Sequence, residues 1–231
     1  MFDACSMADY LDASGTGDSR EANTSGSTGS SESSVEQYYR FHSALYDATR
    51  WAFLFGRSEI LRLVAAAGSP ARILEVGCGT GRNLVELAQL FPDAQITAVD
   101  LSSSMLRHAR RKTNFLGDRI ELLHQSYDAP IGAKPSFDLV LFSYSLTMFN
   151  PGFELAIDCA KSDLEPGGCV AVVDFHDTRH PGLSRWMRFN HVRTDGHLRA
   201  EIRNRFSPID DELRTAWGGA WRYLMFLGRR V

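Results

Sequence analysis

The chain has 231 residues, of which 44% are hydrophobic, enough for one domain with a sizeable core. No apolar run approaches the roughly 18 residues that a membrane-spanning helix needs, and no basic segment precedes an apolar one at the N-terminus. The composition therefore predicts a protein with neither a membrane span nor a secretion signal.

The formal net charge of −3 conceals an uneven distribution along the chain. Residues 1–34 hold six acidic residues against one arginine, whereas residues 179–231 hold eleven arginines against five acidic residues. A basic C-terminal region beside a catalytic site would attract an anionic surface or substrate. The alternative is that arginine is simply the preferred cation of this chain, which has only three lysines.

The cysteines and histidines lack the spacing of a metal or redox site. The four cysteines lie far apart, which is typical of a protein in the reducing cytoplasm. Histidines are frequent between positions 176 and 197, but no compact pair stands beside an acidic third ligand. We therefore predict a cytoplasmic protein without a bound metal.

The N-terminal 34 residues differ sharply from the rest of the chain. They are rich in Ser, Gly, Thr and Asp and poor in branched aliphatic residues, so we expect them to be disordered. Residues 35–231 are predicted to form a single domain. It begins with an aromatic-rich segment, residues 35–68, whose patterning fits two amphipathic helices and then a third over residues 58–67.

Residues 72–83 organise the rest of the chain. Residues 72–76 are predicted to form a short buried strand, and the glycines at 77, 79 and 81 then form a turn that backbone or ligand can approach closely. Apolar residues at helical spacing follow from position 84 until Pro92 ends the helix. A strand, a glycine turn and a helix are the opening of a doubly wound α/β sheet, whose ligands bind at the carboxyl ends of the strands.

Two acidic residues indicate which ligand this turn binds. The glycines are spaced G-x-G-x-G, whereas a dinucleotide site has G-x-G-x-x-G. Glu75 precedes the first glycine and suits an ammonium group rather than a pyrophosphate. Asp100 ends the next predicted strand, where it would accept hydrogen bonds from a ribose diol. Together these features describe S-adenosylmethionine, and in them the chain resembles class I methyltransferases.

The resemblance implies a Rossmann-like, mostly parallel sheet of seven strands with an antiparallel last strand. Further strands are expected at residues 120–123, 137–142, 169–175 and 223–227, and a helix begins near Pro151. The aromatic segment 35–68 would be a helical lid, and residues 179–206, too polar for a core, would form a substrate-facing insertion. The resemblance and the motif positions together imply thirteen cofactor-binding residues: Tyr46, Glu75, Gly77, Cys78, Gly79, Gly81, Asn83, Asp100, Leu101, Met105, Ser126, Tyr127 and Phe142. Ser126 departs from the family, since many relatives have an acidic residue there that binds the adenine amino group.

A narrower resemblance is to the bacterial betaine-lipid N-methyltransferases. It rests on motifs at residues 46–51, 53–57, 173–177, 190–192, 196–198 and 219–223. It implies trimethylation of the amine of diacylglyceryl-homoserine by S-adenosylmethionine, with S-adenosylhomocysteine as the product. The partner would be this lipid at the inner membrane face, together with the aminocarboxypropyl transferase that makes it. Residues 179–206, with their arginines and a tryptophan, would dock the protein on the membrane as a peripheral protein.

The amine must lose a proton before it attacks, and Tyr144 and His176, which follow predicted strands, are the candidate acceptors. Tyr39 and Tyr46 are expected to orient the head group through their rings, and arginine suits the substrate's carboxylate. The candidate substrate-binding residues are Tyr39, Arg50, Arg188, His191, Arg193 and His197. For each arginine, a structural ion pair is the competing explanation.

Three other functions remain open at this stage. The acceptor could instead be phosphatidylethanolamine or a small soluble amine. The chain could be a cofactor-binding regulatory subunit, because an intact cofactor motif does not prove turnover. Dinucleotide oxidoreduction is disfavoured by the glycine spacing, and no nucleic-acid-binding module is recognisable. The oligomeric state cannot be read from the sequence.

Overall fold

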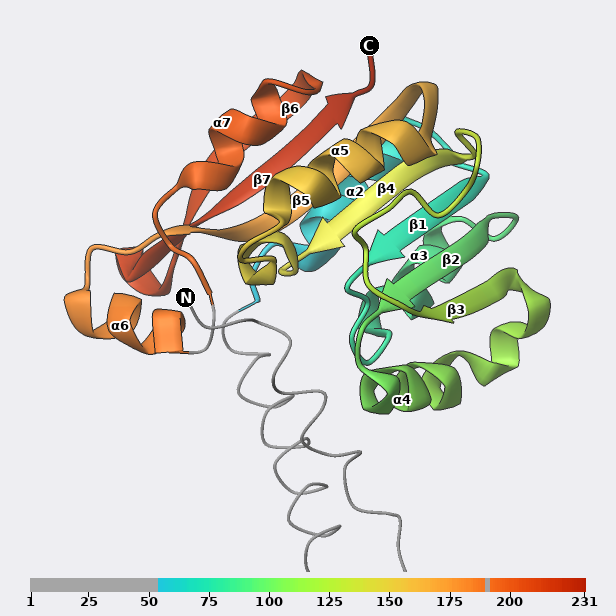
Figure 1. The fold of residues 1–231 in the computed structure, drawn as a ribbon, viewed down its shortest axis with the longest axis horizontal. Helices are drawn as coiled ribbons and strands as arrows, with labels where there is room; N and C mark the ends of the chain where they lie inside the picture. The colour runs from blue at the N-terminus through green and yellow to red at the C-terminus, as the bar shows by residue number, and fades with distance from the viewer. Residues whose placement is uncertain (1–53, 190–191) are drawn as a thin grey trace, which may run out of the picture. The chain divides into compact units, whose positions relative to one another are not determined.

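The computed structural model describes residues 54–189 and 192–231, and this part is built on one seven-stranded sheet (Figure 1). The strands lie in the order β3-β2-β1-β4-β5-β7-β6. Their bounds are β1 Arg72–Val76, β2 Gln95–Asp100, β3 Ile120–His124, β4 Phe137–Ser143, β5 Leu164–Asp177, β6 Ser207–Ala216 and β7 Trp221–Arg229. β7 is antiparallel to both of its neighbours, whereas the pairs among β1 to β5 are parallel. The predicted fold class is confirmed.

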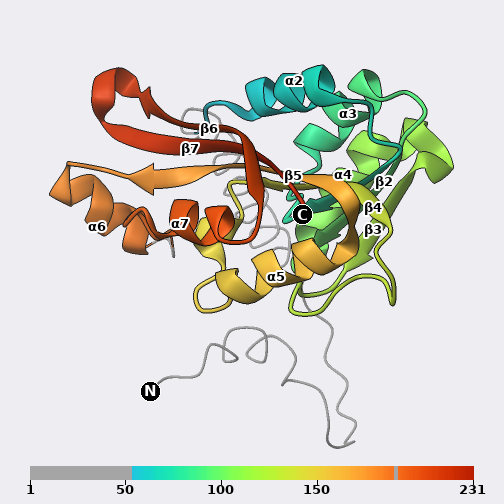
Figure 2. The same ribbon diagram turned by 90° about the horizontal axis from the view of Figure 1, so that it is seen from above.

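Helices cover both faces of this sheet (Figure 2). The α-helices are α2 Arg57–Ala67, α3 Arg82–Leu90, α4 Ser103–Thr113, α5 Phe153–Asp163, α6 Pro181–Phe189 and α7 His197–Arg203. Short 3-10 helices follow α4 (η2 Asn114–Arg119), β4 (η3 Leu146–Met148) and β6 (η4 Trp217–Gly219). None of the helices in the described ranges is long and apolar enough to cross a membrane.

The core divides into two clusters because neighbouring residues of a strand point to opposite faces. Ile73 of β1 packs with α2, α3 and α4 in one cluster, and Leu74 packs with α5 and α7 in the other. β4 repeats the division with Leu141 and Phe142. The central strands are therefore buried on both faces, which explains their nearly continuous apolar sequences.

Three segments differ in detail from the sequence-based expectations. β6 was not located from the sequence. Within the predicted insertion, residues 179–206, the structure forms α6 and α7, and Leu198 and Ile202 of α7 are buried in the core. Part of this segment therefore covers the sheet. Residues 57–67 of the predicted lid form α2, which packs on the sheet, whereas residues 1–53 lie outside the described residues.

Candidate active site

The glycine turn after β1 is open to solvent at its centre. Gly77, Gly79 and Gly81 have φ angles of +72°, +55° and +73°, in the left-handed region that favours glycine. A Cβ atom at Gly77 would lie 2.6 Å from the Cβ of Ser145, and one at Gly81 would lie 2.9 Å from the Cβ of Ala109. No other atom of residues 54–189 and 192–231 lies within 4 Å of the corresponding position at Gly79. Packing therefore constrains the outer two glycines, while Gly79 faces open space.

Asp100 holds this turn at the end of β2. Its Oδ2 atom accepts a hydrogen bond of 2.7 Å from the backbone N–H of Gly79, and its Oδ1 atom accepts one of 2.8 Å from that of Ser102. A carboxylate has about four acceptor positions, so these two bonds leave others for a ligand. Asp100 thus shapes the turn and can still bind a diol.

Glu75 is buried beneath the turn with one oxygen unpaired. Only 1% of its surface is exposed, and its Oε1 atom accepts a hydrogen bond of 2.7 Å from the side-chain amide of Asn83. Its Oε2 atom is buried and has no hydrogen-bond partner among the described residues. Burial raises the pKa of Glu75 to about 7. An unpaired buried carboxylate oxygen is the acceptor that a ligand's ammonium group requires.

Tyr144 connects the end of β4 to the start of α2. It has a left-handed φ of +57°, is 2% exposed, and its hydroxyl donates a hydrogen bond of 2.7 Å to the carbonyl of Phe55. Its ring meets that of Phe175 edge-on, with centroids 4.8 Å apart. Burial raises the pKa of Tyr144 well above its ordinary value, so the phenol stays neutral. Arg57 reinforces the junction with a 3.1 Å hydrogen bond from its Nε to the Oγ of Ser143.

Asp174, near the end of β5, is a buried carboxylate that belongs to the sequence motif 173–177 but was not predicted as a site residue. It is 0% exposed and accepts hydrogen bonds from the N–H and hydroxyl of Thr147 and from the N–H of Phe175, at 3.2, 2.5 and 2.8 Å. Burial raises its pKa to about 6. Asp174 therefore fixes the loop that follows β4 against the end of β5. An acidic residue inside an apolar strand was the available signal.

Two histidines meet at this same edge of the sheet. His176 follows Asp174, and the segment 192–197 is held to it because the N–H of Gly196 donates to the carbonyl of His176 at 2.9 Å. His197 then begins α7, and its Nδ1 atom hydrogen bonds to Asp195. The Nδ1 atom of His176 and the Nε2 atom of His197 are buried without a partner in the described part of the chain. Burial lowers the pKa of each histidine.

The remaining substrate candidates have different surroundings. Arg193 is paired with Asp195 at 2.7 Å, and its guanidinium lies 5.5 Å from the centre of the Phe153 ring. Arg188 is exposed on α6. Tyr39, Arg50 and His191 lie outside the described residues. The structure therefore brings His176, Arg193 and His197 together and leaves Arg188 on a neighbouring helix.

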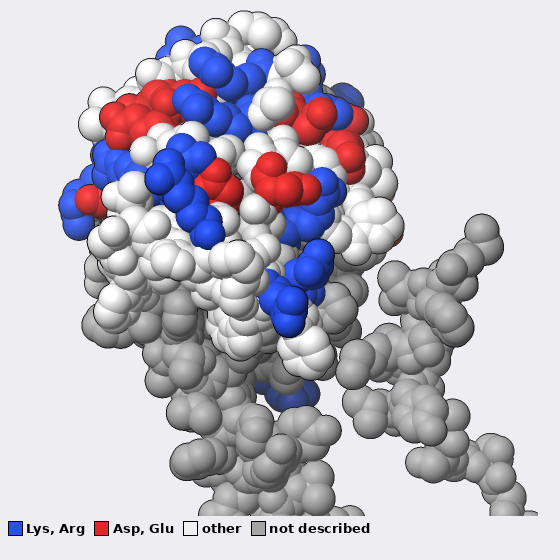
Figure 3. Space-filling model, turned by 90° about the vertical axis from the view of Figure 1, so that its left-hand side faces the viewer, with Lys and Arg blue, Asp and Glu red and all other residues white. Residues whose placement is uncertain are grey.

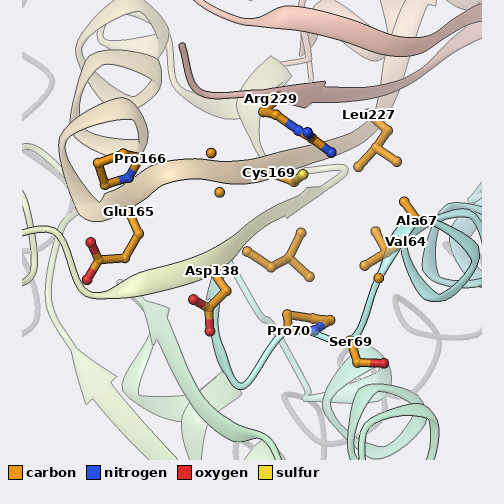
Figure 4. A pocket seen from close by; sticks show the side chains of 14 residues that line it. Val64, Ala67, Ser69, Pro70, Asp138, Glu165, Pro166, Cys169, Leu227 and Arg229 are labelled. Carbon is orange, nitrogen blue, oxygen red and sulfur yellow. The ribbon is translucent and has the colours of Figure 1, made fainter.

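A pocket lies at the opposite edge of the sheet, away from the glycine turn (Figure 4). Asp138 and Glu165 line it on one side and Arg229 on another. Asp138 accepts hydrogen bonds from the N–H groups of Ala71 and Arg72 at 3.0 and 2.8 Å, and the Arg72 guanidinium pairs with Glu165 at 3.3 Å. The two acidic side chains of the pocket thus stabilise the start of β1. The pocket is separate from the site at the carboxyl edge.

Comparison with known proteins agrees with this geometry. Residues 73–168 match the family model of the methyltransferase domain. A structure of the N-methyltransferase NodS from Bradyrhizobium japonicum with S-adenosyl-L-homocysteine superposes with a TM-score of 0.63 at 20% identity, covering 75% of this chain and 85% of that one. The 1,6-didemethyltoxoflavin-N1-methyltransferase of Burkholderia thailandensis gives 0.64 at 18% identity, covering 90% and 93%. The described part of the chain therefore has the class I methyltransferase fold, and residues 73–168 match the methyltransferase domain.

Curated relatives that match this part of the chain are methyltransferases named for different acceptors. A malonyl-[acyl-carrier protein] O-methyltransferase of Geobacter sulfurreducens is 38% identical over 59% of this chain and 52% of its own length. A ubiquinone/menaquinone biosynthesis C-methyltransferase of Syntrophotalea carbinolica is 29% identical over 60% of each. The chain spans about half the length of the curated relatives that it matches. The comparisons therefore support the domain and leave the acceptor atom open.

The residues of the methyltransferase domain fit S-adenosylmethionine. The unpaired Oε2 of Glu75 would accept from the ligand's ammonium group, the open face of Gly79 would admit the ligand, and the Asp100 carboxylate would hold the ribose. Asn83 fixes the Glu75 carboxylate from below. These residues come from β1, β2 and α3 and lie at one edge of the sheet.

The other predicted cofactor contacts have mixed environments. Leu101 is 73% exposed, Ser126 is exposed and Met105 is half-buried at the start of α4. Tyr127 and Phe142 are packed in the second core cluster, and the Tyr127 hydroxyl donates to Asp163 at 2.8 Å. Tyr127 and Phe142 are thus engaged in packing. The contacts of all five residues with the cofactor stay predictions. Cys78 is buried with a raised pKa, so it remains a neutral thiol, and Tyr46 lies outside the described residues.

No group of metal-ligating side chains occurs within residues 54–189 and 192–231.

Proposed function

We propose that this protein is an N-methyltransferase that converts the amine of diacylglyceryl-homoserine to its trimethylated betaine form. One observation supports an amine as the acceptor. Two buried imidazole nitrogens, Nδ1 of His176 and Nε2 of His197, have no hydrogen-bond partner among the described residues, and they lie at the carboxyl edge that also holds the glycine turn. An ammonium must lose a proton before its nitrogen can attack, and neutral imidazoles are the acceptors suited to neutral pH. The motif resemblance supports the choice of lipid.

Methyl transfer requires little of the protein beyond aligning the amine with the methyl group. When bound, S-adenosylmethionine would supply a methyl group already activated by its sulfonium. The protein then has to align the amine, exclude water and keep the nitrogen unprotonated. Burial of the surrounding side chains serves the last two requirements, because a low dielectric lowers the pKa of an ammonium.

The carboxylate of the substrate needs a cationic partner. Arg193 is engaged by Asp195, whereas Arg188 is exposed on α6, the helix that precedes the segment 192–197. We therefore propose Arg188 as the partner for the carboxylate, since arginine pairs with carboxylates through two parallel hydrogen bonds. Phosphatidylethanolamine lacks this carboxylate and would not use Arg188.

A lipid substrate also requires contact with a membrane surface, and we propose that α6 makes it on the cytoplasmic face. Trp186 and Phe189 of α6 are 52% and 84% exposed, and residues 178–194 contain four arginines and no acidic residue. In Figure 3, the lower part of the described surface carries basic and uncharged side chains, and the acidic ones gather above. An exposed aromatic helix with flanking arginines has the properties of an interfacial helix.

Mass spectrometry of lipids tests the proposal. Purified protein is incubated with S-adenosylmethionine and vesicles that contain either diacylglyceryl-homoserine or phosphatidylethanolamine. We expect up to three successive methyl additions on the homoserine lipid alone. Additions on the ethanolamine lipid would instead support methylation of that amine. No addition on either lipid, with cofactor binding intact, would contradict both and favour a soluble acceptor or a non-catalytic subunit.

A further inference from the structure

We infer that Asp195 and His197 form the proton-accepting pair of this methyl transfer, with the Nε2 atom of His197 as the acceptor. The inference rests on the proposed function, since it assigns the proton that the substrate's ammonium must lose. The sequence points to Tyr144 and His176 for this step and places His197 only among the substrate-binding residues.

The contacts of the pair assign the tautomer of the histidine. The Nδ1 atom of His197 hydrogen bonds to the Oδ1 atom of Asp195, and the backbone N–H of His197 lies 3.4 Å from the same oxygen. Arg193 holds the other oxygen of Asp195 through its Nη2 and Nε atoms at 2.7 and 3.1 Å. An ionised carboxylate only accepts hydrogen bonds, so the proton of the neutral ring lies on Nδ1 and the lone pair on Nε2.

The Nε2 atom of His197 is buried and free to accept a hydrogen bond. It has no hydrogen-bond partner in the described part of the chain, and the side chain of His197 is only 12% exposed. The ring of Phe153 meets the imidazole edge-on at 4.5 Å and fixes its plane. Leaving a buried acceptor unpaired is unfavourable, and an N–H donor of the substrate would remove that cost.

Backbone contacts hold the pair at the catalytic edge of the sheet. Asp195 forms an isolated β-bridge with Asp177 at the end of β5, and Gly196 bonds to the carbonyl of His176. The N–H of Arg193 donates to the carbonyl of Thr147, in the loop after β4, at 3.2 Å. The segment 192–197 therefore spans the carboxyl ends of β4 and β5, where this fold binds its ligands.

The two other candidates lack this arrangement. The hydroxyl of Tyr144 donates to the carbonyl of Phe55, and its raised pKa keeps it a neutral phenol, which is a weak base. His176 has an unpartnered Nδ1 atom, but no carboxylate in the described ranges hydrogen bonds to its ring. His176 instead packs against Gly196, where an added Cβ would lie 3.0 Å from its Cε1 atom.

The charges that face His197 suit a proton acceptor. Burial lowers its pKa and Arg193 lowers it further, whereas Asp195 and Glu154 raise it. The ring is therefore neutral near pH 7 and ready to accept. In the transfer, an N–H bond of the ammonium breaks, its electron pair stays on nitrogen as the attacking lone pair, and the proton joins Nε2. Asp195 then offsets the charge of the imidazolium, which returns its proton to solvent.

The test compares methyl transfer by wild type, His197→Gln, Asp195→Asn and His108→Asn between about pH 6 and pH 9.5. His108 is an exposed histidine on α4, so its variant is the matched control and should match wild type. We expect His197→Gln to lower kcat about 100-fold or more near pH 7, with the deficit shrinking as alkaline pH frees the amine. A deficit that is equal at every pH, or none, would overturn the inference.

Two readouts do not depend on turnover. Calorimetric binding of S-adenosylhomocysteine and thermal melting should be unchanged in His197→Gln, which separates loss of chemistry from loss of fold. NMR of labelled histidines should show the Nδ1-protonated tautomer of His197, and Asp195→Asn should lower the pKa of His197 because the carboxylate raises it. The opposite tautomer, or an unchanged pKa, would overturn the pairing. An inactive wild type would overturn the proposed function and this role with it, whereas an active His197→Gln would overturn this role alone.

Discussion

Burial of the Glu75 carboxylate has two consequences: it destabilises the folded protein, and it leaves an oxygen that can bind a cationic group. The carboxylate is buried in β1, where the described residues offer one donor, Asn83, to Oε1 and none to Oε2. Burial of this charge costs more than the attraction of Arg57 and the Asn83 hydrogen bond return, since the pKa of Glu75 is raised. The same unpaired oxygen is what the ammonium of a ligand would bind.

The pH dependence of stability should report this residue. Burial raises the pKa of Glu75 from 4.5 to about 7, so its contribution to stability is complete below about pH 4.5 and is lost as the pH rises through about 7. We expect Glu75→Gln to remove this loss and to raise Tm at about pH 8, by an amount equivalent to at most about 3 kcal/mol. Calorimetry of wild type and Glu75→Gln at about pH 4.5 and about pH 8 measures the difference, which should be large only at the higher pH.

Neighbouring groups and a control keep this experiment specific. The pKa of Asp174 is raised to about 6, so its loss of stability has the same sign, but Asp174 is present in both proteins and its contribution cancels in the comparison. Glu75→Gln should also weaken S-adenosylhomocysteine binding by about tenfold or more. Glu121→Gln, at an exposed position on β3, should change neither property. An unchanged affinity in Glu75→Gln would contradict the binding role.

A substitution of Tyr144 distinguishes a structural role of its hydroxyl from a role as proton acceptor. Replacing it with phenylalanine keeps the ring contact with Phe175 and removes the hydrogen bond to the Phe55 carbonyl. Leaving this carbonyl unpaired should lower the free energy of unfolding by about 1–2 kcal/mol, measurable by denaturant titration. Methyl transfer should fall by the same factor at every pH. A deficit that vanishes at alkaline pH would instead make the hydroxyl a proton acceptor.

At the scale of elements, α6 differs from the helices that cover the sheet. It is nine residues long, and only Met187 among its residues is buried. Its exposed aromatic side chains alternate with arginines, whereas exposed positions elsewhere are mostly polar. Such a helix gains little from the protein core and has apolar surface to bury elsewhere.

Flotation with anionic vesicles tests α6 directly. Phe189→Ala should weaken vesicle binding by about 2 kcal/mol, the contribution of one buried phenylalanine, and Arg185→Gln by about 1 kcal/mol. Phe115→Ala is the matched control, because Phe115 is 71% exposed in η2, after α4. Equal flotation of all three variants, or no preference of wild type for anionic vesicles, would contradict docking through α6.

At the scale of the molecule, the sequence separates a polar N-terminal region from the fold. Residues 1–34 lie outside the described residues, and their composition predicts disorder. We expect a chain that begins at residue 35 to keep the Tm and the S-adenosylhomocysteine affinity of the full chain. A loss of several degrees in a melting experiment would show that these residues contribute to the fold.

The sequence determined the centre of this protein because the physics there is local. A short apolar run predicts a buried strand, glycines are favoured at positive φ, and an acidic residue before them predicts a cationic ligand group. The structure has β1 at Arg72–Val76, left-handed glycines at 77, 79 and 81, and a buried Glu75. The α/β fold, with its antiparallel seventh strand, followed from the same pattern and the family resemblance.

Tertiary structure alone decided the features that depend on distant contacts. β6 is an edge strand that pairs only with β7, so its ten residues carry little apolar pattern to detect. α7 was hidden in a polar segment because its short length gives only two buried residues. The hydroxyl of Tyr144 meets a carbonyl 89 residues away, and Thr147 in the loop after β4 meets Arg193, which lies about half that distance along the sequence. Periodicity reports which face of an element is buried, but not which distant group it meets there.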